Sequence, residues 1–410
     1  MGLRGQKAQL PVGSVELQDI FLSLVRLGIG TESVDDFKLA THSSEPIDWT
    51  AIKTLADEQG LTAVILDGVN SLSGFNGLSS LSNSAIQGPP RIEKLQWIGE
   101  VQHWENVIAT QQKAAEEMAC LFHENDIRTY VLKGLVVSEC YPNPNHRVSV
   151  DLDCYLGKEC KGLKSLNGSR SLSSLRSSNG SGDTHEEAWR RGNELIKAQG
   201  HDVSDEFYKN STFHLPGLMV ENHLYMTPFR GNKSLKLLEV VLQTMMSDDK
   251  GEGRIEGTWL YRPPVMLSAL FLIEHAYSHF LHEGLTWRMV LDWQMFSRKH
   301  KAEIDWTALE MWIDEFGFRK FYDSYHRLGL YLLGELRVES LEFRDKRMLK
   351  DIWAPLDLHE TVRGWRGKLA LAGNTWRARW KYKYFTNITW LHALWIQTRG
   401  FLFEKEPRLD

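Results

Sequence analysis

Two aspartates, Asp151 and Asp153, stand two positions apart in a segment that alternates apolar and polar residues. Over residues 148–156 this alternation predicts a β-strand with both carboxylates on one face and apolar side chains on the other. Two carboxylates this close repel each other unless a cation compensates their charge. Mg²⁺ bound by one or two carboxylates and by substrate phosphates is the usual solution in phosphoryl and nucleotidyl transfer. The alternative is that both acids lie on a solvated face of an edge strand.

A third acidic residue falls on a second predicted strand. Residues 211–215 and 218–226 predict two strands joined by a tight turn. Glu221 and His223 share one face of the second strand. An acid at this point would bind a second metal ion or accept the proton of an attacking hydroxyl. The alternatives are a solvated Glu221 and a His223 that serves packing or hydrogen bonding.

The segment before the aspartates predicts a strand, a tight turn and a short helix. Residues 129–132 are apolar or β-branched, Lys133-Gly134 interrupts them, and residues 135–140 have the spacing of a brief helix. This order, followed by a D-x-D strand, resembles the nucleotidyltransferase superfamily that includes DNA polymerase beta. A narrower motif resembles that of an uncharacterised bacterial nucleotidyltransferase family, and it is carried by Leu132-Lys133-Gly134, Tyr141-Pro142-x-Pro144, Arg147 and Asp151-Leu152-Asp153.

The resemblance implies a way to bind a nucleoside triphosphate. The wider superfamily has Gly-Ser or Gly-Gly at the turn, where this chain has Lys133-Gly134-Leu135, so we expect Lys133 to supply positive charge in place of a seryl contact. The backbone N–H groups of Gly134 and Leu135 would bind phosphate at the start of the short helix. Arg147 would add a fixed positive charge. The alternatives are a solvated turn lysine and an arginine that only pairs with the acids.

The resemblance also implies the metal and the reaction. Asp151, Asp153 and Glu221 would hold two Mg²⁺ ions, with Mn²⁺ as the alternative ion, and Glu221-Asn222-His223 matches an acid-x-His motif of the family. The reaction would move a nucleoside monophosphate from a nucleoside triphosphate to a hydroxyl or phosphate acceptor. A small molecule, a protein and an RNA all stay open as acceptors. A rival function is a catalytically silent nucleotide-binding or regulatory module of the same fold.

A histidine-rich helix offers a rival metal site. His275, His279 and His282 recur at i, i+4 and i+7 in an apolar segment, which places them on one helix face. Such a spacing can bind zinc and predicts, as an alternative function, a metal-dependent hydrolase at His275 and His279. The H-E-x-x-H order of zinc hydrolases does not occur in this segment.

The segment after this helix matches a W-R-x-x-x-D pattern of the same family at Trp287, Arg288 and Asp292. Because Arg288 and Asp292 stand four positions apart on a predicted helix, an ion pair between them is the simplest expectation. A share in binding the nucleotide or the acceptor is the alternative. We therefore expect a set of supporting positions around the acids, namely His223, His275, His279, Arg288 and Asp292.

Composition narrows the class of protein. A net charge of −5 over 410 residues argues against a protein that coats nucleic acid, although a nucleic-acid acceptor is not excluded. No apolar run approaches about 18 residues, so we predict no transmembrane segment. The first residues lack the apolar core of a signal peptide. Four cysteines without C-x-x-C spacing favour a reducing, cytoplasmic location.

The elements together predict an α+β protein in which a small mixed sheet is embedded in a mainly helical chain. We expect three regions: a helical region 1–128, a nucleotidyltransferase core 129–230 with a flexible Ser/Gly-rich insertion 157–184, and a helical domain 231–410 with a basic, aromatic tail. Within the first region, helices are predicted at 15–35, 47–75 and 91–125. The tail would cover the C-terminal domain, with binding of nucleic acid or an acidic membrane surface as alternatives.

Overall fold

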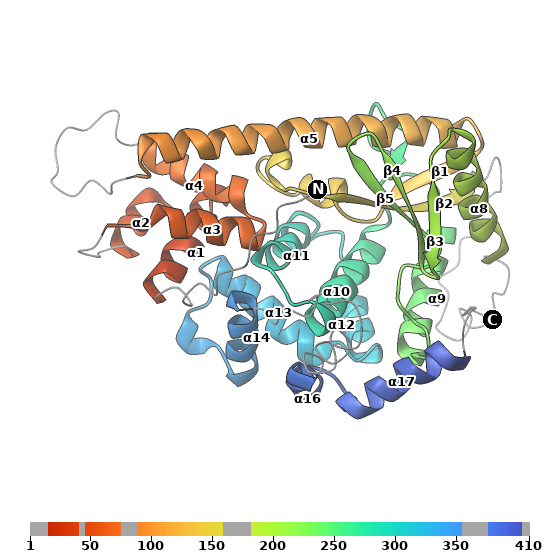
Figure 1. The fold of residues 1–410 in the computed structure, drawn as a ribbon. Helices are drawn as coiled ribbons and strands as arrows, with labels where there is room; N and C mark the ends of the chain where they lie inside the picture. Colours follow the sequence, from red (N-terminus) through yellow and green to blue (C-terminus); the bar gives the residue numbers. More distant parts are fainter. Residues whose placement is uncertain (1–14, 41–45, 75–87, 159–181, 355–375, 404–410) are drawn as a thin grey trace, which may run out of the picture.

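The computed structural model describes residues 15–40, 46–74, 88–158, 182–354 and 376–403. A mixed six-stranded sheet lies among many helices, which confirms the predicted α+β class. Figure 1 shows the long helix α5 (Arg91–His123) along one side, with the N-terminal helices near one end of it and the sheet near the other. The predicted flexible insertion falls mainly on residues 159–181, which lie outside the described residues.

The sheet places the D-x-D strand in its interior. The strand order is β3-β4-β5-β2-β1-β6, so β2 (Asp151–Lys158) lies between β1 (Ile127–Val131) and β5 (Leu218–His223). β2 pairs antiparallel with β1 and parallel with β5. The remaining strands lie at the two sides of the sheet and are β3 (Val203–Phe207), β4 (Asn210–Leu215) and β6 (Leu260–Tyr261). Sequence patterns do not predict β3 and β6, because β3 is polar and β6 has two residues.

The predicted N-terminal helices are each divided in two. In place of single helices over 15–35 and 47–75, the chain forms α1 (Val15–Ile29), α2 (Val34–Ala40), α3 (Trp49–Gln59) and α4 (Thr62–Gly74). Asp48 caps α3 as expected, because its side chain accepts a hydrogen bond from the Ala51 N–H. Gly60 ends α3 in the left-handed conformation with φ 69°, which explains the division of the second predicted helix.

Helix α5 links the N-terminal helices to the sheet, as its predicted span over 91–125 requires. Near its start Trp97 is buried, and its Nε1 donates to the Thr62 carbonyl at 3.0 Å. Near its end Ala119 and Phe122 pack in one buried cluster with Ile127 of β1. This helix is therefore a scaffold for the first strand, as expected.

The helices after the D-x-D strand cover the sheet and build the second half of the molecule. Their order is α8 (Gly182–Ala198), α9 (Lys233–Ser247), α10 (Val265–His282), α11 (Trp287–Lys299), α12 (Trp306–Glu315), α13 (Arg319–Leu332), α14 (Phe343–Trp353), α16 (Arg379–Phe385) and α17 (Trp390–Phe403). One large cluster of buried side chains contains residues of the N-terminal helices and of α10, α11 and α13. The two helical regions therefore share a core. The predicted region boundaries stay a prediction.

The C-terminal tail is partly buried. Lys381 is fully buried, lies 2.8 Å from Asp351 and donates to the Phe280 carbonyl at 2.7 Å. At least this lysine is therefore structural, although Leu391 and Trp395 of α17 remain exposed. Within the described ranges, no helix is both long and apolar enough to cross a bilayer.

Candidate functional site

Asp153 and Glu221 are neighbours because β2 and β5 run parallel. The register pairs Asp153 with Glu221 and Asp151 with Met219, and alternate residues of a strand share a face, so the three acids project from one face of the sheet. Asp153 is 2% exposed. The alternative of a solvated edge-strand face is therefore wrong for this motif, because β2 is an interior strand and Asp153 is buried.

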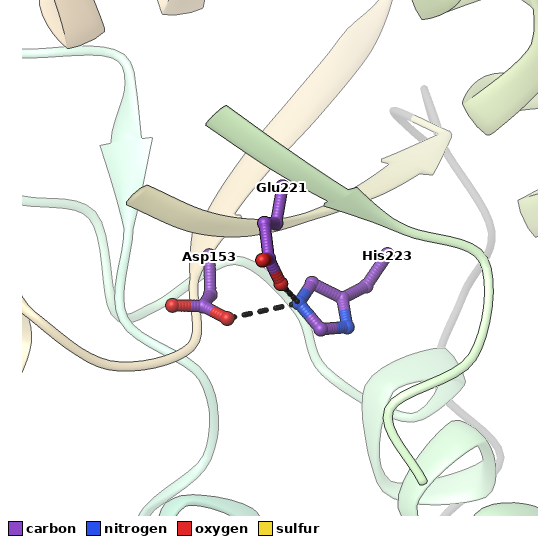
Figure 2. Close-up of side chains that lie close together, drawn as sticks. All are labelled: Asp153, Glu221 and His223. Carbon is purple, nitrogen blue, oxygen red and sulfur yellow. Dashed lines mark hydrogen bonds and ion pairs between the residues drawn. The ribbon is translucent and has the colours of Figure 1, made fainter. Parts of the chain in front are cut away.

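His223 joins Asp153 to Glu221. Figure 2 shows its imidazole pointing at both carboxylates, with Nε2 2.9 Å from Asp153 Oδ1 and 3.6 Å from Glu221 Oε2. Its Nδ1 lies 3.2 Å from the Tyr225 carbonyl. Burial by itself would lower the pKa of His223, but the hydrogen bonds to the two carboxylates raise it. The ring therefore favours the doubly protonated form, in which both nitrogens donate.

Lys133 supplies the cation that the aspartate pair requires. Its Nζ lies 3.0 Å from Asp153 Oδ2 and 3.7 Å from Asp151 Oδ2, and its side chain is 14% exposed. Burial alone would lower the pKa of Lys133, but the charges of Asp153 and Asp151 raise it. The alternative of a solvated turn lysine is therefore wrong. In this structure an ion pair, with Lys133 as the cation, occupies the space beside the two aspartates.

The same contacts keep the acids ionised. Burial would raise the pKa of Asp153, but the nearby Lys133 ammonium and the hydrogen bond from His223 lower it far below its usual range. The hydrogen bond from His223 also lowers the pKa of Glu221. Both carboxylates are thus anionic at neutral pH. This is the state in which a carboxylate binds a metal.

The residues present fit a divalent cation. Asp153, Glu221 and His223 each offer one ligand atom, and the three atoms lie within 4.8 Å of one another. Two carboxylates and an imidazole suit Mn²⁺, whereas Mg²⁺ prefers oxygen ligands, which Asp151 would add. His223 would bind the metal through Nε2 only after losing its Nε2 proton, with its Nδ1 proton still donated to the Tyr225 carbonyl.

A cavity of about 620 Å³ opens over these acids. Most of the predicted site residues line it, namely Lys133, Arg147, Asp151, Asp153, Glu221, His275, His279, Arg288 and Asp292. His223 is 1% exposed and supports the acids from behind. Gly134 and Leu135 are not among the lining residues, and the helix that they begin, α6 (Leu135–Ser138), has only four residues. Phosphate binding by their N–H groups stays a prediction.

The tyrosine and arginine of the sequence motif hold the segment before β2. Arg147 donates to both oxygens of Asp292, with Nη2 to Oδ2 at 2.7 Å and Nε to Oδ1 at 3.1 Å. Tyr141 also donates to Asp292 Oδ1, at 2.7 Å. Arg288 donates to the Val148 carbonyl at 2.8 Å. The expected pairing of Arg288 with Asp292 is therefore wrong: each binds the segment that leads into β2.

Comparison with known families agrees with this geometry. The family described as "Uncharacterised nucleotidyltransferase" matches residues 45–162 and 174–333, more than half of the chain. The chain belongs to this family. The expected resemblance to an uncharacterised nucleotidyltransferase family is thereby confirmed. No curated protein and no solved structure matches the chain.

The match covers the strands, the acids and α10 to α13 of this nucleotidyltransferase family member, and α14, α16 and α17 lie after it.

The rival zinc site on α10 finds no support in the geometry. His275 Nε2 lies 3.4 Å from Lys133 Nζ, His279 Nδ1 lies 2.8 Å from Glu283, and His282 Nδ1 lies 2.9 Å from the Ser278 carbonyl. Among the described residues, the group found able to hold a metal is the one on β2 and β5.

Several cavity residues escape sequence reasoning. Lys209 lines the cavity from the turn between β3 and β4, Asn210 from the start of β4, and Glu274 from α10. Lys209 and Asn210 carry no motif, because a polar turn is an ordinary loop signal. Glu274 could have been noticed as a lone acid within the apolar run LSALFLIEHA, where a buried charge needs a partner.

Proposed function

We propose that this protein transfers a nucleoside monophosphate from a metal-bound nucleoside triphosphate to a hydroxyl or phosphate acceptor. The observation that carries the proposal is the pairing of Asp153 with Glu221 across parallel strands, next to Asp151 and beneath a cavity. Membership of a nucleotidyltransferase family supports the same reaction class.

Asp151, Asp153 and Glu221 would hold the divalent cation, Mg²⁺ or Mn²⁺, which would neutralise the α-phosphate and the pyrophosphate leaving group. Glu221 suits a ligand better than a proton acceptor, because its hydrogen bond from His223 lowers its pKa. His223 would orient both carboxylates. Each of these roles uses the contacts that the side chains already make.

Lys133 and the bound cation would compete for the aspartates. The Lys133 ammonium lies against Asp153 and Asp151 in this structure. A divalent cation bound to these aspartates would displace the ammonium, which could then pair with the triphosphate. Arg147 would act differently from the first expectation. Because the Arg147 guanidinium already donates to both oxygens of Asp292, we assign Arg147 to positioning β2 and lining the cavity.

The proposal is tested by calorimetric titration of MgATP and MgGTP into the wild type, Asp153→Asn and a control, Asp205→Asn, whose carboxylate is exposed on β3. Loss of a buried charged ligand should weaken binding by about 100-fold in Asp153→Asn, equivalent to about 3 kcal/mol. Equal affinities in the wild type and Asp153→Asn would contradict the proposal.

Turnover needs a second measurement. Incubation with α-³²P-labelled nucleotides and fractions of cell lysate should label an acceptor and release pyrophosphate with the wild type but not with Asp153→Asn. Tight MgATP binding without labelling in any fraction would favour the silent nucleotide-binding module instead.

A further inference from the structure

A second pocket adjoins the cavity over the acids. Its volume is about 360 Å³, and the residues that line it include Tyr208, Tyr277, Tyr382, Leu281 and Ile388. Four residues line both cavities, namely Pro228, Glu274, Ser278 and His282. The two spaces therefore meet along α10. A largely apolar pocket of this size suits a small organic molecule better than a macromolecule.

Glu274 stands at the boundary with an unsatisfied oxygen. The residue is 3% exposed, and its Oε1 is buried without a hydrogen-bond partner in the described part of the chain. A second buried glutamate gives the contrast. Glu239 accepts from the N–H groups of Met226 and Thr227 at 3.1 and 2.7 Å and from Gln243 at 2.9 Å. Glu239 is thus fully paired, whereas Glu274 Oε1 has no donor among the described residues.

The electrostatic surroundings define that donor. The pKa of Glu274 is raised to about 7: burial is the main cause, the charge of Glu239 adds to it, and Lys209 and His223 oppose it. Arg230 and His282 also line the second pocket, and the Arg230 guanidinium lies 4.3 Å from the centre of the Tyr208 ring. A positively charged group of a ligand next to Glu274 would stabilise the ionised carboxylate and donate a hydrogen bond to it. Tyrosine rings around the pocket also favour a cation.

The same helix connects Glu274 to the acids. The next residue, His275, lies 3.4 Å from Lys133 Nζ, which in turn lies 3.0 Å from Asp153. Because residues of α10 line both pockets, a molecule bound at Glu274 would extend from the second pocket into the cavity above the acids.

We propose that the second pocket holds the acceptor of the transfer reaction, and that this acceptor is a small molecule with an ammonium group bound by Glu274 and an apolar or aromatic body between the tyrosines. The inference rests on the proposed function, because the acceptor's reacting oxygen must reach a nucleotide held at the acids. Glu274 provides specificity for the amine and takes no part in the chemical step.

The test uses 2-phenylethylamine as the probe, with 3-phenylpropionate as an anionic counterpart of similar size. Ligand-observed NMR titrations compare the wild type, Glu274→Gln and Glu283→Gln, a control that removes an acid from the end of the same helix. We expect the amine to bind the wild type and the control more tightly than the anion. Its affinity should fall by at least about tenfold in Glu274→Gln, as loss of a charged hydrogen bond implies.

A second variant guards against misfolding of Glu274→Gln. Ile388→Trp would fill the pocket from the C-terminal side and should abolish binding of the probe. Amine affinity that is equal in the wild type, Glu274→Gln and Ile388→Trp would overturn the proposal.

Repeating the titration with Asp153→Asn separates the two proposals. Amine binding that persists in Asp153→Asn, while MgATP binding is lost, supports both of them. Amine binding without any MgATP binding in the wild type would contradict the transfer reaction alone. MgATP binding with amine affinity independent of Glu274 would contradict the acceptor pocket alone.

Discussion

The buried carboxylate of Glu274, whose Oε1 has no hydrogen-bond partner among the described residues, should make the stability of the protein depend on pH. Glu274→Gln should remove this contribution. The pKa of Glu274 is raised to about 7 in the folded protein, against 4.5 for an ordinary glutamate. The folded state therefore holds this proton more tightly than the unfolded state. The favourable contribution is complete below pH 4.5, declines as the pH rises, and is lost above about pH 7.

The size of the effect follows from that difference. At about 1.4 kcal/mol per pKa unit, ionisation of Glu274 costs the folded state about 3 kcal/mol at pH 8. Glutamine has the same shape and does not ionise. The stability of Glu274→Gln relative to the wild type should therefore rise by about 3 kcal/mol between pH 4 and pH 8. For 410 residues this corresponds to an increase of roughly 3 to 4 °C in melting temperature.

Urea denaturation and thermal melts at pH 4, 5, 6, 7 and 8 would measure this difference. A constant offset between the two proteins is acceptable, because the glutamine amide is itself buried, and the slope with pH is the informative quantity. Glu283→Gln shows whether removal of any acid from α10 has the same effect. A relative stability that stays flat from pH 4 to pH 8, or that falls, would refute the claim that Glu274 is unpaired.

Two further predictions concern the residues around the acids. Arg147→Met should destabilise the protein by about 3 to 5 kcal/mol in urea denaturation, because it leaves the Asp292 carboxylate buried without its paired cation. The double variant with Asp292→Leu should recover part of this loss. If the stability losses of the two single variants simply add in the double variant, the pair is not coupled. Lys133→Met should strengthen Mn²⁺ binding in the absence of nucleotide and weaken ATP binding, both by calorimetry, because the ammonium competes for Asp153. Weaker Mn²⁺ binding would contradict that competition.

Local patterns were enough to find the acids. Alternation with a period of two residues places Asp151 and Asp153 on one face wherever the strand packs, and the turn at Gly134 with φ 68° follows from a glycine between a strand and a helix. The helix 91–125 was equally clear, because its apolar spacing extends over many turns. The division of the N-terminal helices does not follow from the sequence, because a single glycine inside a helical pattern is also compatible with a continuous helix.

Partners that are distant in the chain could not be inferred this way. Arg288 and Asp292 are suitably spaced for an ion pair, yet Asp292 binds Arg147, 145 positions away, because the segment before β2 packs against α11. Spacing along one helix shows which of its side chains are close enough to pair. It does not show which donors from distant parts of the chain will compete for the same acceptor.

The amino-acid sequence by itself determined the residue types, the faces of the strands and the family, because these depend on neighbours within a few positions. Only the tertiary structure decided that Asp153 lies opposite Glu221, that Lys133 and His223 compensate their charge, and that Glu274 lines a second pocket with Oε1 unpaired within the described ranges. Strand register, burial and the pairing of charges arise from packing between distant segments, and no local pattern encodes which segments meet.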